Sequence, residues 1–308
     1  MKLLLSKPRG FCAGVVRAIE TVKLALKKWG PPIYVKHQIV HNRHVVEELR
    51  KLGAVFIEDL TEVPQGSYVI YSAHGVTPEV REIARKRALV EVDATCGLVT
   101  RVHSAAKRFA KLGYYILLIG HRDHVEVIGT AAQAPKSTTI IESLQDVDNL
   151  CFPITQKLFY TTQTTLGLED VKEIIDHLQK KYPYIETLPT SSICYATTNR
   201  QLALKQIAAK SDLILVVGDN ASSNSNRLQE LGEKCQIPTY LINDEREIKS
   251  LWLDNKKIIG LTAGASTPEY LVSQCVEKLQ TLGVTEIEEL SLIEENVFFQ
   301  LPKEVLVR

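Results

Sequence analysis

The sequence predicts an α/β protein built from small, mainly parallel sheets. The chain has 308 residues, of which 45% are hydrophobic and 24% charged, so we expect a globular protein long enough for two or three domains. Short β-branched runs alternate with amphipathic helical patterns throughout the chain. This alternation is typical of parallel strands flanked by helices.

The alternation can be followed from the first third of the chain to the last. A β-branched run at 33–35 precedes a helical pattern at 41–53, and the run at 68–75 precedes the pattern at 77–88. Later strands are expected at 114–121, 157–165, 213–218 and 258–266, and later helices at 168–182, 226–234 and 268–280. Ligands of open α/β sheets collect where strands give way to helices, so we expect functional residues at these junctions.

Two cysteines divide the chain into segments of similar length. Cutting just after Cys96 and just before Cys194 gives residues 1–96, 97–193 and 194–308, and each segment can form a small α/β lobe. The last segment also carries a C-terminal tail. No low-complexity linker separates them, so we expect the lobes to pack closely.

The composition argues against several classes of function. The 37 Lys and Arg residues nearly balance the 36 Asp and Glu residues, so no global charge attracts nucleic acid or an anionic membrane. The apolar run in the first residues, MKLLLSKPRG, is too short for a signal peptide. No apolar run approaches the roughly 20 residues of a membrane helix. We expect a cytoplasmic protein whose six cysteines are not a disulfide framework.

Three cysteines share one kind of position. Cys12, Cys96 and Cys194 each stand where an apolar strand-like run gives way to an amphipathic helix. A helix amino terminus favours a thiolate, and thiolates bind metals. Structural zinc sites usually use closely spaced cysteine pairs, whereas three widely separated thiolates suit an iron–sulfur cluster with one iron open to a substrate. An open iron implies catalysis.

The other cysteines do not share this position. Cys235 and Cys275 lie late in helical patterns, and Cys151 lies between elements. A lone cytosolic cysteine is usually a small buried hydrophobe. We expect these three to serve packing.

Three histidines follow predicted strands, in IVHN, SAHGV and GHRDHVEV. A single histidine at such a junction is usually a capping or packing residue, but His41, His74 and His124 occupy equivalent junctions beside hydroxyls and an amide. Their hydrogen-bond donors suit a polyanion such as phosphate. The remaining histidines have weaker placements and are expected to be surface or structural residues: His37, His44, His103, His121 and His177.

Two further segments supply small polar residues to a helix amino terminus after a strand. In GDNASSNSNRL, Ser222 and Asn224 belong to a run more polar than a helix cap requires, which favours phosphate binding. In GLTAGASTPEY, Ser266 could bind phosphate equally well or begin a capping box with Glu269.

Glu126 is the carboxylate of this set of junction residues. Beside an open iron and a bound anion, burial would raise its pKa and keep it protonated, so it is the expected proton donor. Thr164 and Thr165 could position that proton or cap the helix predicted at 168–182, and the residues alone do not decide between these roles.

Together these motifs resemble the 4-hydroxy-3-methylbut-2-enyl diphosphate reductase family of the methylerythritol phosphate route to isoprenoids. The resemblance rests on PRGFCAGV, VHNR, SAHGV, DATC with LVT, TQTTL, ICYATTNRQ, SSNSNRL and TAGAS, in order from about residue 8 to the C-terminus. It implies three lobes related by pseudo-threefold symmetry around one four-iron, four-sulfur (4Fe-4S) cluster, held by Cys12, Cys96 and Cys194 with one iron open.

The resemblance also implies a reaction and roles for the polar residues. The reaction is the reductive removal of the allylic hydroxyl, giving isopentenyl and dimethylallyl diphosphate plus water. Glu126 and Thr164 would deliver the proton. The implied diphosphate contacts are His41, His74, His124, Ser222, Ser223, Asn224 and Ser266. Since the chain has no flavin or nicotinamide fingerprint, two electrons would come from a small ferredoxin or flavodoxin, for which the basic runs 85–87 and 107–108 are docking candidates or merely solvated helix faces.

Two positions depart from the family pattern. Gly97 and Val125 stand where proline is usual, and we expect them to loosen their turns slightly without changing a ligand or a reacting group.

Two other functions remain open from the residues alone. An iron–sulfur dehydratase would share the open iron and the phosphate pocket but would need no reductant. A cluster-containing sensor would bind a partner or nucleic acid, and the neutral charge and the missing recognition module count against it.

Overall fold

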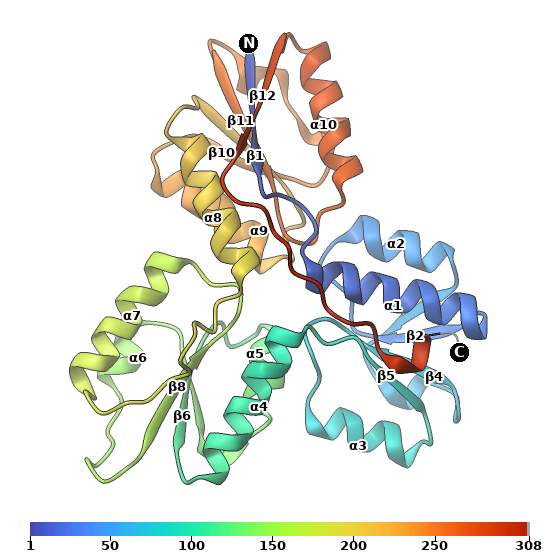
Figure 1. The fold of residues 1–308 in the computed structure, drawn as a ribbon, viewed down its shortest axis with the longest axis vertical. Coiled ribbons are helices and arrows are strands. Elements are labelled where there is room, and N and C mark those ends of the chain that lie inside the picture. Colours follow the sequence, from blue (N-terminus) through green and yellow to red (C-terminus); the bar gives the residue numbers. More distant parts are fainter. Residues whose placement is uncertain (307–308) are drawn as a thin grey trace. The chain divides into compact units, whose positions relative to one another are not determined.

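The computed structural model describes residues 1–306, and within that range the strands form three parallel sheets (Figure 1). The chain separates into two compact units. This confirms the predicted fold class, an α/β chain with three small parallel sheets. No helix within the described range is both long enough and apolar enough to cross a membrane.

The first unit contains Met1–Val16, His41–Val45 and Tyr195–Phe298. Its sheet has the strand order β10-β9-β11-β1-β12. The strands are β1 (Lys2–Lys7), β9 (Leu213–Val217), β10 (Thr239–Ile242), β11 (Ile258–Ala263) and β12 (Glu286–Ser291). The helices are α8 (Tyr195–Ala208), α9 (Ser223–Lys234) and α10 (Glu269–Thr281). Short 3₁₀ turns lie at Glu245–Glu247 and Ser250–Leu253.

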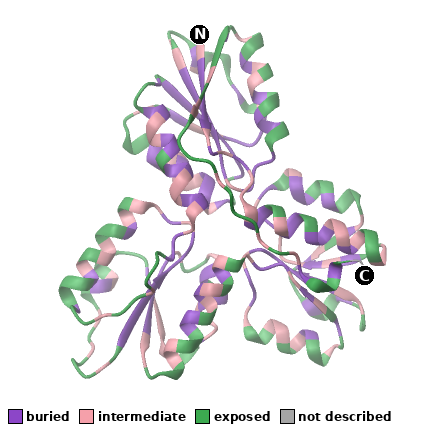
Figure 2. Cartoon of the chain, viewed as in Figure 1, coloured by how far each residue is buried: buried purple, intermediate pink, exposed green. Residues whose placement is uncertain are grey.

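Strand β9 shows why this sheet needs helices on both faces. Its five residues are all buried, and successive side chains of a strand point to opposite faces. Leu213, Leu215 and Val217 pack in a core with α10. Ile214 and Val216 pack in a second core with α8 and α9. Figure 2 shows buried strands and helices exposed on their outer sides.

The second unit contains Arg17–Val40, Val46–Cys194 and the chain from Phe299 onward. One sheet has the order β3-β2-β4-β5 and the other β7-β6-β8. The strands are β2 (Ile33–Lys36), β3 (Ala54–Ile57), β4 (Tyr68–Tyr71), β5 (Val90–Asp93), β6 (Tyr115–Ile119), β7 (Thr138–Ile141) and β8 (Leu158–Thr162). The helices, of which α1 and α2 begin in residues of the first unit, are α1 (Ala13–Trp29), α2 (Arg43–Lys51), α3 (Pro78–Lys86), α4 (Gly97–Lys111), α5 (Val125–Ala131), α6 (Leu144–Asp148) and α7 (Leu168–Lys181). Further 3₁₀ turns lie at Leu60–Glu62, Pro135–Ser137 and Lys303–Val305.

The amino-terminal strand differs from the predicted division of the chain. Residues 1–96 were expected to form one lobe, but β1 lies between β11 and β12 of the last third and pairs with both in parallel. The reason is its sequence: Leu3, Leu4 and Leu5 are all buried, so the strand needs a central place in a sheet covered on both faces. The rest of the proposed lobe division stays a prediction.

Candidate active site

The three cysteines predicted as metal ligands occupy the same local position. Cys12, Cys96 and Cys194 each directly precede the first residue of a helix, α1, α4 and α8, and each is partly exposed. Their backbone N–H groups donate to loop carbonyls: Cys12 to Ala265 at 3.2 Å, Cys96 to Ala73 at 2.9 Å and Cys194 to Thr164 at 2.9 Å. Each sulfur is therefore carried on a fixed backbone at the partly positive end of a helix.

One expectation about these cysteines is wrong. Cys194 was predicted to follow a strand-like run, but residues 187–193 are irregular. Pro189 lacks an N–H group, and the Ser191 side chain accepts locally from the Ile193 N–H at 3.1 Å. Extended pairing therefore stops at an isolated bridge between Phe159 and Glu186.

The remaining cysteines differ from these three. The expectation that all three serve packing is wrong for Cys151 and Cys235, which are exposed, whereas Cys275 on α10 is completely buried in the apolar core. Burial raises the pKa of the Cys275 thiol to about 12, so this cysteine stays a neutral packing residue.

Glu126 and Thr164 form a buried pair in the second unit. Glu126 is 2% exposed and lies in the first turn of α5. Its Oε1 accepts the Thr164 N–H at 2.7 Å, and its Oε2 accepts the Thr164 hydroxyl at 2.8 Å. Burial raises the pKa of Glu126 to about 7, although both hydrogen bonds act to lower it. The carboxyl can therefore carry a proton near neutral pH.

The same threonine connects the carboxyl to a cysteine. The Thr164 carbonyl accepts the Cys194 N–H, while its own N–H and hydroxyl bind Glu126. Thr164 does not cap the following helix, because the N-cap of α7 is Gly167 and no side chain bonds it. Of the two roles left open for Thr164, its contacts match positioning of the carboxyl.

His124 and His74 lie together in the second unit, with ring centroids 6.1 Å apart. His124 is the N-cap of α5, and its Nδ1 accepts the Glu126 N–H at 3.2 Å. This bond assigns the ring proton to Nε2, so that nitrogen is a hydrogen-bond donor. Burial, and then the nearby His121 and His37, lower the pKa of His124 to about 4. The ring is therefore a neutral donor at pH 7.

Two residues beside this group were missed by sequence reasoning. The His37 ring centroid lies 6.0 Å from that of His74, and Gln163 donates from Nε2 to the Thr165 hydroxyl at 3.1 Å. Gln163 also accepts the His121 N–H through Oε1. Gln163 belongs to the TQTTL motif, which was the available signal. His37 gave no comparable signal, because its positive φ of 62° cannot be read from the sequence.

The polar run after β9 is a folded loop and helix start in the first unit. Ser222 is the N-cap of α9 and accepts the Ser225 N–H at 3.3 Å, so it does form a cap. Ser223 is the first residue of that helix. Asn224 is 4% exposed; its Oδ1 accepts the Ala265 N–H at 2.8 Å. Since the Ala265 carbonyl accepts the Cys12 N–H, Asn224 and Cys12 bind opposite sides of one residue.

Ser266 forms a hydrogen bond with His41, another predicted site residue, but it is not the N-cap of α10. Its hydroxyl donates to the His41 carbonyl at 2.9 Å, and the N-cap of α10 is Pro268. The capping-box alternative is therefore wrong. A phosphate oxygen would have to compete with the His41 carbonyl for the hydroxyl proton, or Ser266 would act by positioning His41.

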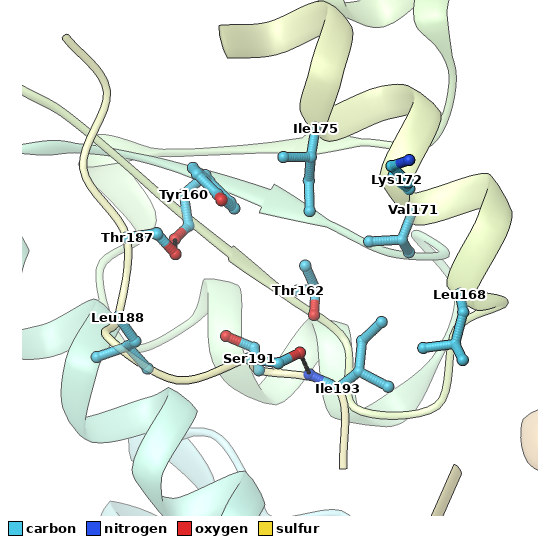
Figure 3. Close-up of a pocket in the computed structure, with 11 residues that line it drawn as sticks. Tyr160, Thr162, Leu168, Val171, Lys172, Ile175, Thr187, Leu188, Ser191 and Ile193 are labelled. Atoms are coloured by element: carbon cyan, nitrogen blue, oxygen red, sulfur yellow. Dashed lines mark hydrogen bonds between the residues drawn. The ribbon is translucent and has the colours of Figure 1, made fainter. Parts of the chain in front are cut away.

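The second unit contains a cavity of about 280 Å³ (Figure 3). Its wall combines β8, α7 and the irregular segment that leads to Cys194. Leu168, Val171 and Ile175 make the helix side of the wall, and Ser191 and Ile193 lie opposite. Because the segment before Cys194 borders this cavity, side chains do not fully cover that side of it.

Comparison with known proteins identifies the family. A family model described as LytB protein matches residues 3–280. The chain belongs to the LytB family. A relative from Protochlamydia amoebophila (strain UWE25), named 4-hydroxy-3-methylbut-2-enyl diphosphate reductase, is 64% identical over 99% of this chain and 98% of its own length. A relative of the same name from Chlamydia trachomatis serovar D is 55% identical over 99% of each chain.

Solved structures agree with this membership in the LytB family. The structure of the E-1-hydroxy-2-methyl-but-2-enyl-4-diphosphate reductase from Plasmodium falciparum has a TM-score of 0.97 at 48% identity, covering 99% of this chain and 96% of that one. A second solved (E)-4-hydroxy-3-methyl-but-2-enyl diphosphate reductase has a TM-score of 0.66 at 30% identity, covering 91% and 99%. The predicted resemblance is confirmed.

The two departures from the family pattern have different surroundings. Gly97 is the first residue of α4, and a Cβ there would lie 3.3 Å from the Phe299 ring. Val125 is the first residue of α5, directly after the capping His124. Neither replaces a side chain that bonds Glu126 or Thr164.

Proposed function

We propose that this chain reduces 4-hydroxy-3-methylbut-2-enyl diphosphate to isopentenyl and dimethylallyl diphosphate, the last step of the methylerythritol phosphate pathway. The hydroxyl leaves as water, a hydrogen is added to carbon, and two electrons and two protons balance the step. The observation that carries the proposal is the buried Glu126 carboxyl, bonded through both oxygens to Thr164, whose carbonyl accepts from Cys194. This couples a proton donor to a proposed metal ligand.

Cys12, Cys96 and Cys194 would hold a 4Fe-4S cluster with one open iron. The donor set fits that group, because all three thiols are partly exposed and precede helices, unlike the exposed Cys151 and Cys235 or the core residue Cys275. When bound, the cluster would supply electrons and a Lewis-acidic iron for the substrate hydroxyl.

Glu126 would give the proton that lets the hydroxyl leave as water. Its pKa of about 7 keeps a useful protonated fraction at neutral pH. Protonated Oε2 can donate to the Thr164 oxygen while the Thr164 hydroxyl donates onward, so a 5% exposed threonine can pass on a proton from a 2% exposed carboxyl.

The residues proposed to bind the diphosphate are neutral hydrogen-bond donors. In the second unit, Nδ1 of His124 accepts the Glu126 N–H, which makes Nε2 the donor of that ring, and His74 lies beside it. Thr165, next to Thr164, is half-buried. In the first unit, the hydroxyls and amide at the start of α9 would bind phosphate oxygens at a helix amino terminus. The proposed contacts are His41, His74, His124, Thr165, Ser222, Ser223, Asn224 and Ser266.

The electrons would come from an external protein such as a ferredoxin or a flavodoxin, in the cytoplasm. Arg85 and Lys86 on α3 are 72% and 73% exposed, so they are accessible to an acidic donor. Nucleic acid and membranes would not take part, consistent with a net charge of +1.

The test is an anaerobic assay with reduced viologen dye. Purified protein with its cluster intact should oxidise the dye only when 4-hydroxy-3-methylbut-2-enyl diphosphate is added. Cys96→Ser should lower both bound iron and turnover, while Cys275→Ser should leave bound iron unchanged. An intact cluster with no substrate-dependent dye oxidation would overturn the assignment and favour a dehydratase or a sensor.

A further inference from the structure

Each proposed ligand is followed by an arginine on the next helix. Arg17 lies five residues after Cys12 on α1, Arg101 five residues after Cys96 on α4, and Arg200 six residues after Cys194 on α8. Each guanidinium donates to the segment that leads into a different one of the three cysteines.

Arg200 is the most deeply buried member, with 0% exposure. It donates to the Gly10 carbonyl from Nη2 at 2.7 Å and from Nε at 3.1 Å, and Nη2 also lies 3.4 Å from the Phe11 carbonyl. These are the two residues directly before Cys12. Glu295 balances the buried charge, with Oε1 at 3.0 Å from Nη1. A buried charge loses its hydration, so these hydrogen bonds are needed to compensate for that loss.

Arg17 makes the corresponding contacts before Cys96. Its Nη1 donates to the Thr95 carbonyl at 3.0 Å, and its Nη2 donates to the Asp93 carbonyl at 3.1 Å. Its Nε donates to the Gln300 carbonyl at 2.7 Å. All its donor nitrogens are thus engaged with backbone oxygens, two of which belong to the last three residues before Cys96.

Arg101 contacts the segment before Cys194. Its Nη1 donates to the Thr190 hydroxyl at 2.7 Å, and its Nη2 donates to the Ser191 carbonyl. This segment is irregular, and Ser191 and Ile193 line the cavity of Figure 3. A wall segment without strand pairing depends more on such side-chain contacts for its position.

We propose that Arg17, Arg101 and Arg200 are positioning residues that fix the backbone leading into Cys96, Cys194 and Cys12, respectively. The inference rests on the proposed ligation by these cysteines. A planar guanidinium can donate to several carbonyls at once in a fixed geometry, which an ammonium cannot do. Each of the three helices therefore carries an arginine that orders the backbone before a cysteine other than the one that precedes the helix.

The test is cysteine-specific alkylation of the full-length, cluster-free protein with iodoacetamide, read by mass spectrometry. Arg17→Met should raise the alkylation rate at Cys96, Arg101→Met at Cys194 and Arg200→Met at Cys12. Loss of hydrogen bonds from a charged donor should give a rise of roughly tenfold. The lysine variants should lie between wild type and methionine, because one ammonium replaces only part of the contact.

Two controls separate positioning from general destabilisation. Arg87→Met removes an arginine that donates to the Val63 carbonyl at 2.6 Å, and it should alter none of the three rates. Cys275 is completely buried in the core, so its alkylation reports global unfolding. If the alkylation rate rises at Cys275 and at all other cysteines in a methionine variant, that variant is unfolding. The matching lysine variant then tests the proposal.

The pattern of affected cysteines decides the proposal. It is overturned if the rise occurs at the cysteine on the arginine's own helix, occurs equally at all three cysteines, or does not occur. Iron content after anaerobic reconstitution is measured in parallel. If the wild type binds no iron, the proposed function is contradicted. If the wild type binds iron and every arginine variant has the same iron content and spectrum, only the positioning role is contradicted.

Discussion

Replacing Glu126 with glutamine is expected to change both turnover and the pH dependence of stability. Glutamine has nearly the same shape, and its Oε1 can still accept the Thr164 N–H. It cannot supply a proton. General acid catalysis contributes roughly 10²- to 10⁴-fold, so kcat should fall by at least about 100-fold while the cluster and substrate affinity remain.

The stability effect follows from the buried carboxyl. Burial raises the pKa of Glu126 from 4.5 to about 7, so the folded state binds the proton more tightly than the unfolded state. Ionisation of Glu126 therefore destabilises the folded protein. This loss of stability is absent below about pH 4.5, grows as the pH rises, and is complete above about pH 7. At 1.4 kcal/mol for each tenfold change, ionisation costs the folded protein about 3 kcal/mol. Glutamine does not ionise and avoids this cost.

The assay compares melting temperatures of wild type and Glu126→Gln at pH 5 and pH 8, under anaerobic conditions with equal cluster loading. The variant should gain on wild type between these pH values by roughly 5 °C, from about 3 kcal/mol in a chain of this size. Glu173→Gln, an exposed change on α7, should show no such difference. An equal difference at both pH values would refute the raised pKa, and full turnover would remove Glu126 from the mechanism.

Three further changes probe separate contacts. Thr164→Val removes the hydroxyl that stabilises ionised Glu126, so the basic limb of the pH–kcat profile should move up by about one pH unit, with kcat lowered. Asn224→Ala should raise KM for the diphosphate substrate several-fold more than it lowers kcat, as measured by initial rates. Gly75→Ala should destabilise the fold by about 2 kcal/mol or more in a denaturant titration, because φ is +80° and the new Cβ would lie 2.7 Å from a carbon of the His103 ring.

Matched changes should have smaller effects. Thr165→Val removes a neighbouring hydroxyl bonded to Gln163, and the basic limb should stay where it is. Asn226→Ala, also in α9 but bonded to the Asn220 carbonyl, should leave KM unchanged. Gly30→Ala has φ +75° but no atom within 4 Å of a new Cβ, so it should cost about 1 kcal/mol. Equal effects in each pair would contradict the structural reasons given.

Periodicity predicted the fold class because each helical face and each strand face must be buried against a partner. It did not predict the partner of β1. The run of leucines in β1 indicates burial on both faces, but pairing with β11 and β12, more than 250 residues away, is a tertiary choice that leaves no local mark. The segment before Cys194 shows the opposite error, where apolar character was taken for a strand although Pro189 and the hydroxyls favour irregular structure.

The site was predictable to the extent that chemistry follows local position. The cysteines were recognised by their place before helices, and that place is confirmed. The two hydrogen bonds between Glu126 and Thr164 join α5 to the loop after β8, so sequence alone left the threonine's role open. The three arginines were not selected at all, because an arginine in a helix normally reads as a solvated charge until its carbonyl partners are known.

The most direct measurement identifies the products of one anaerobic incubation. Protein with its cluster intact is mixed with 4-hydroxy-3-methylbut-2-enyl diphosphate, with and without reduced viologen, and the organic diphosphates are analysed by mass spectrometry. The account predicts isopentenyl and dimethylallyl diphosphate only with reductant, at two electrons consumed per molecule of product. Conversion of the substrate without reductant, or dye oxidation without either product, would contradict it.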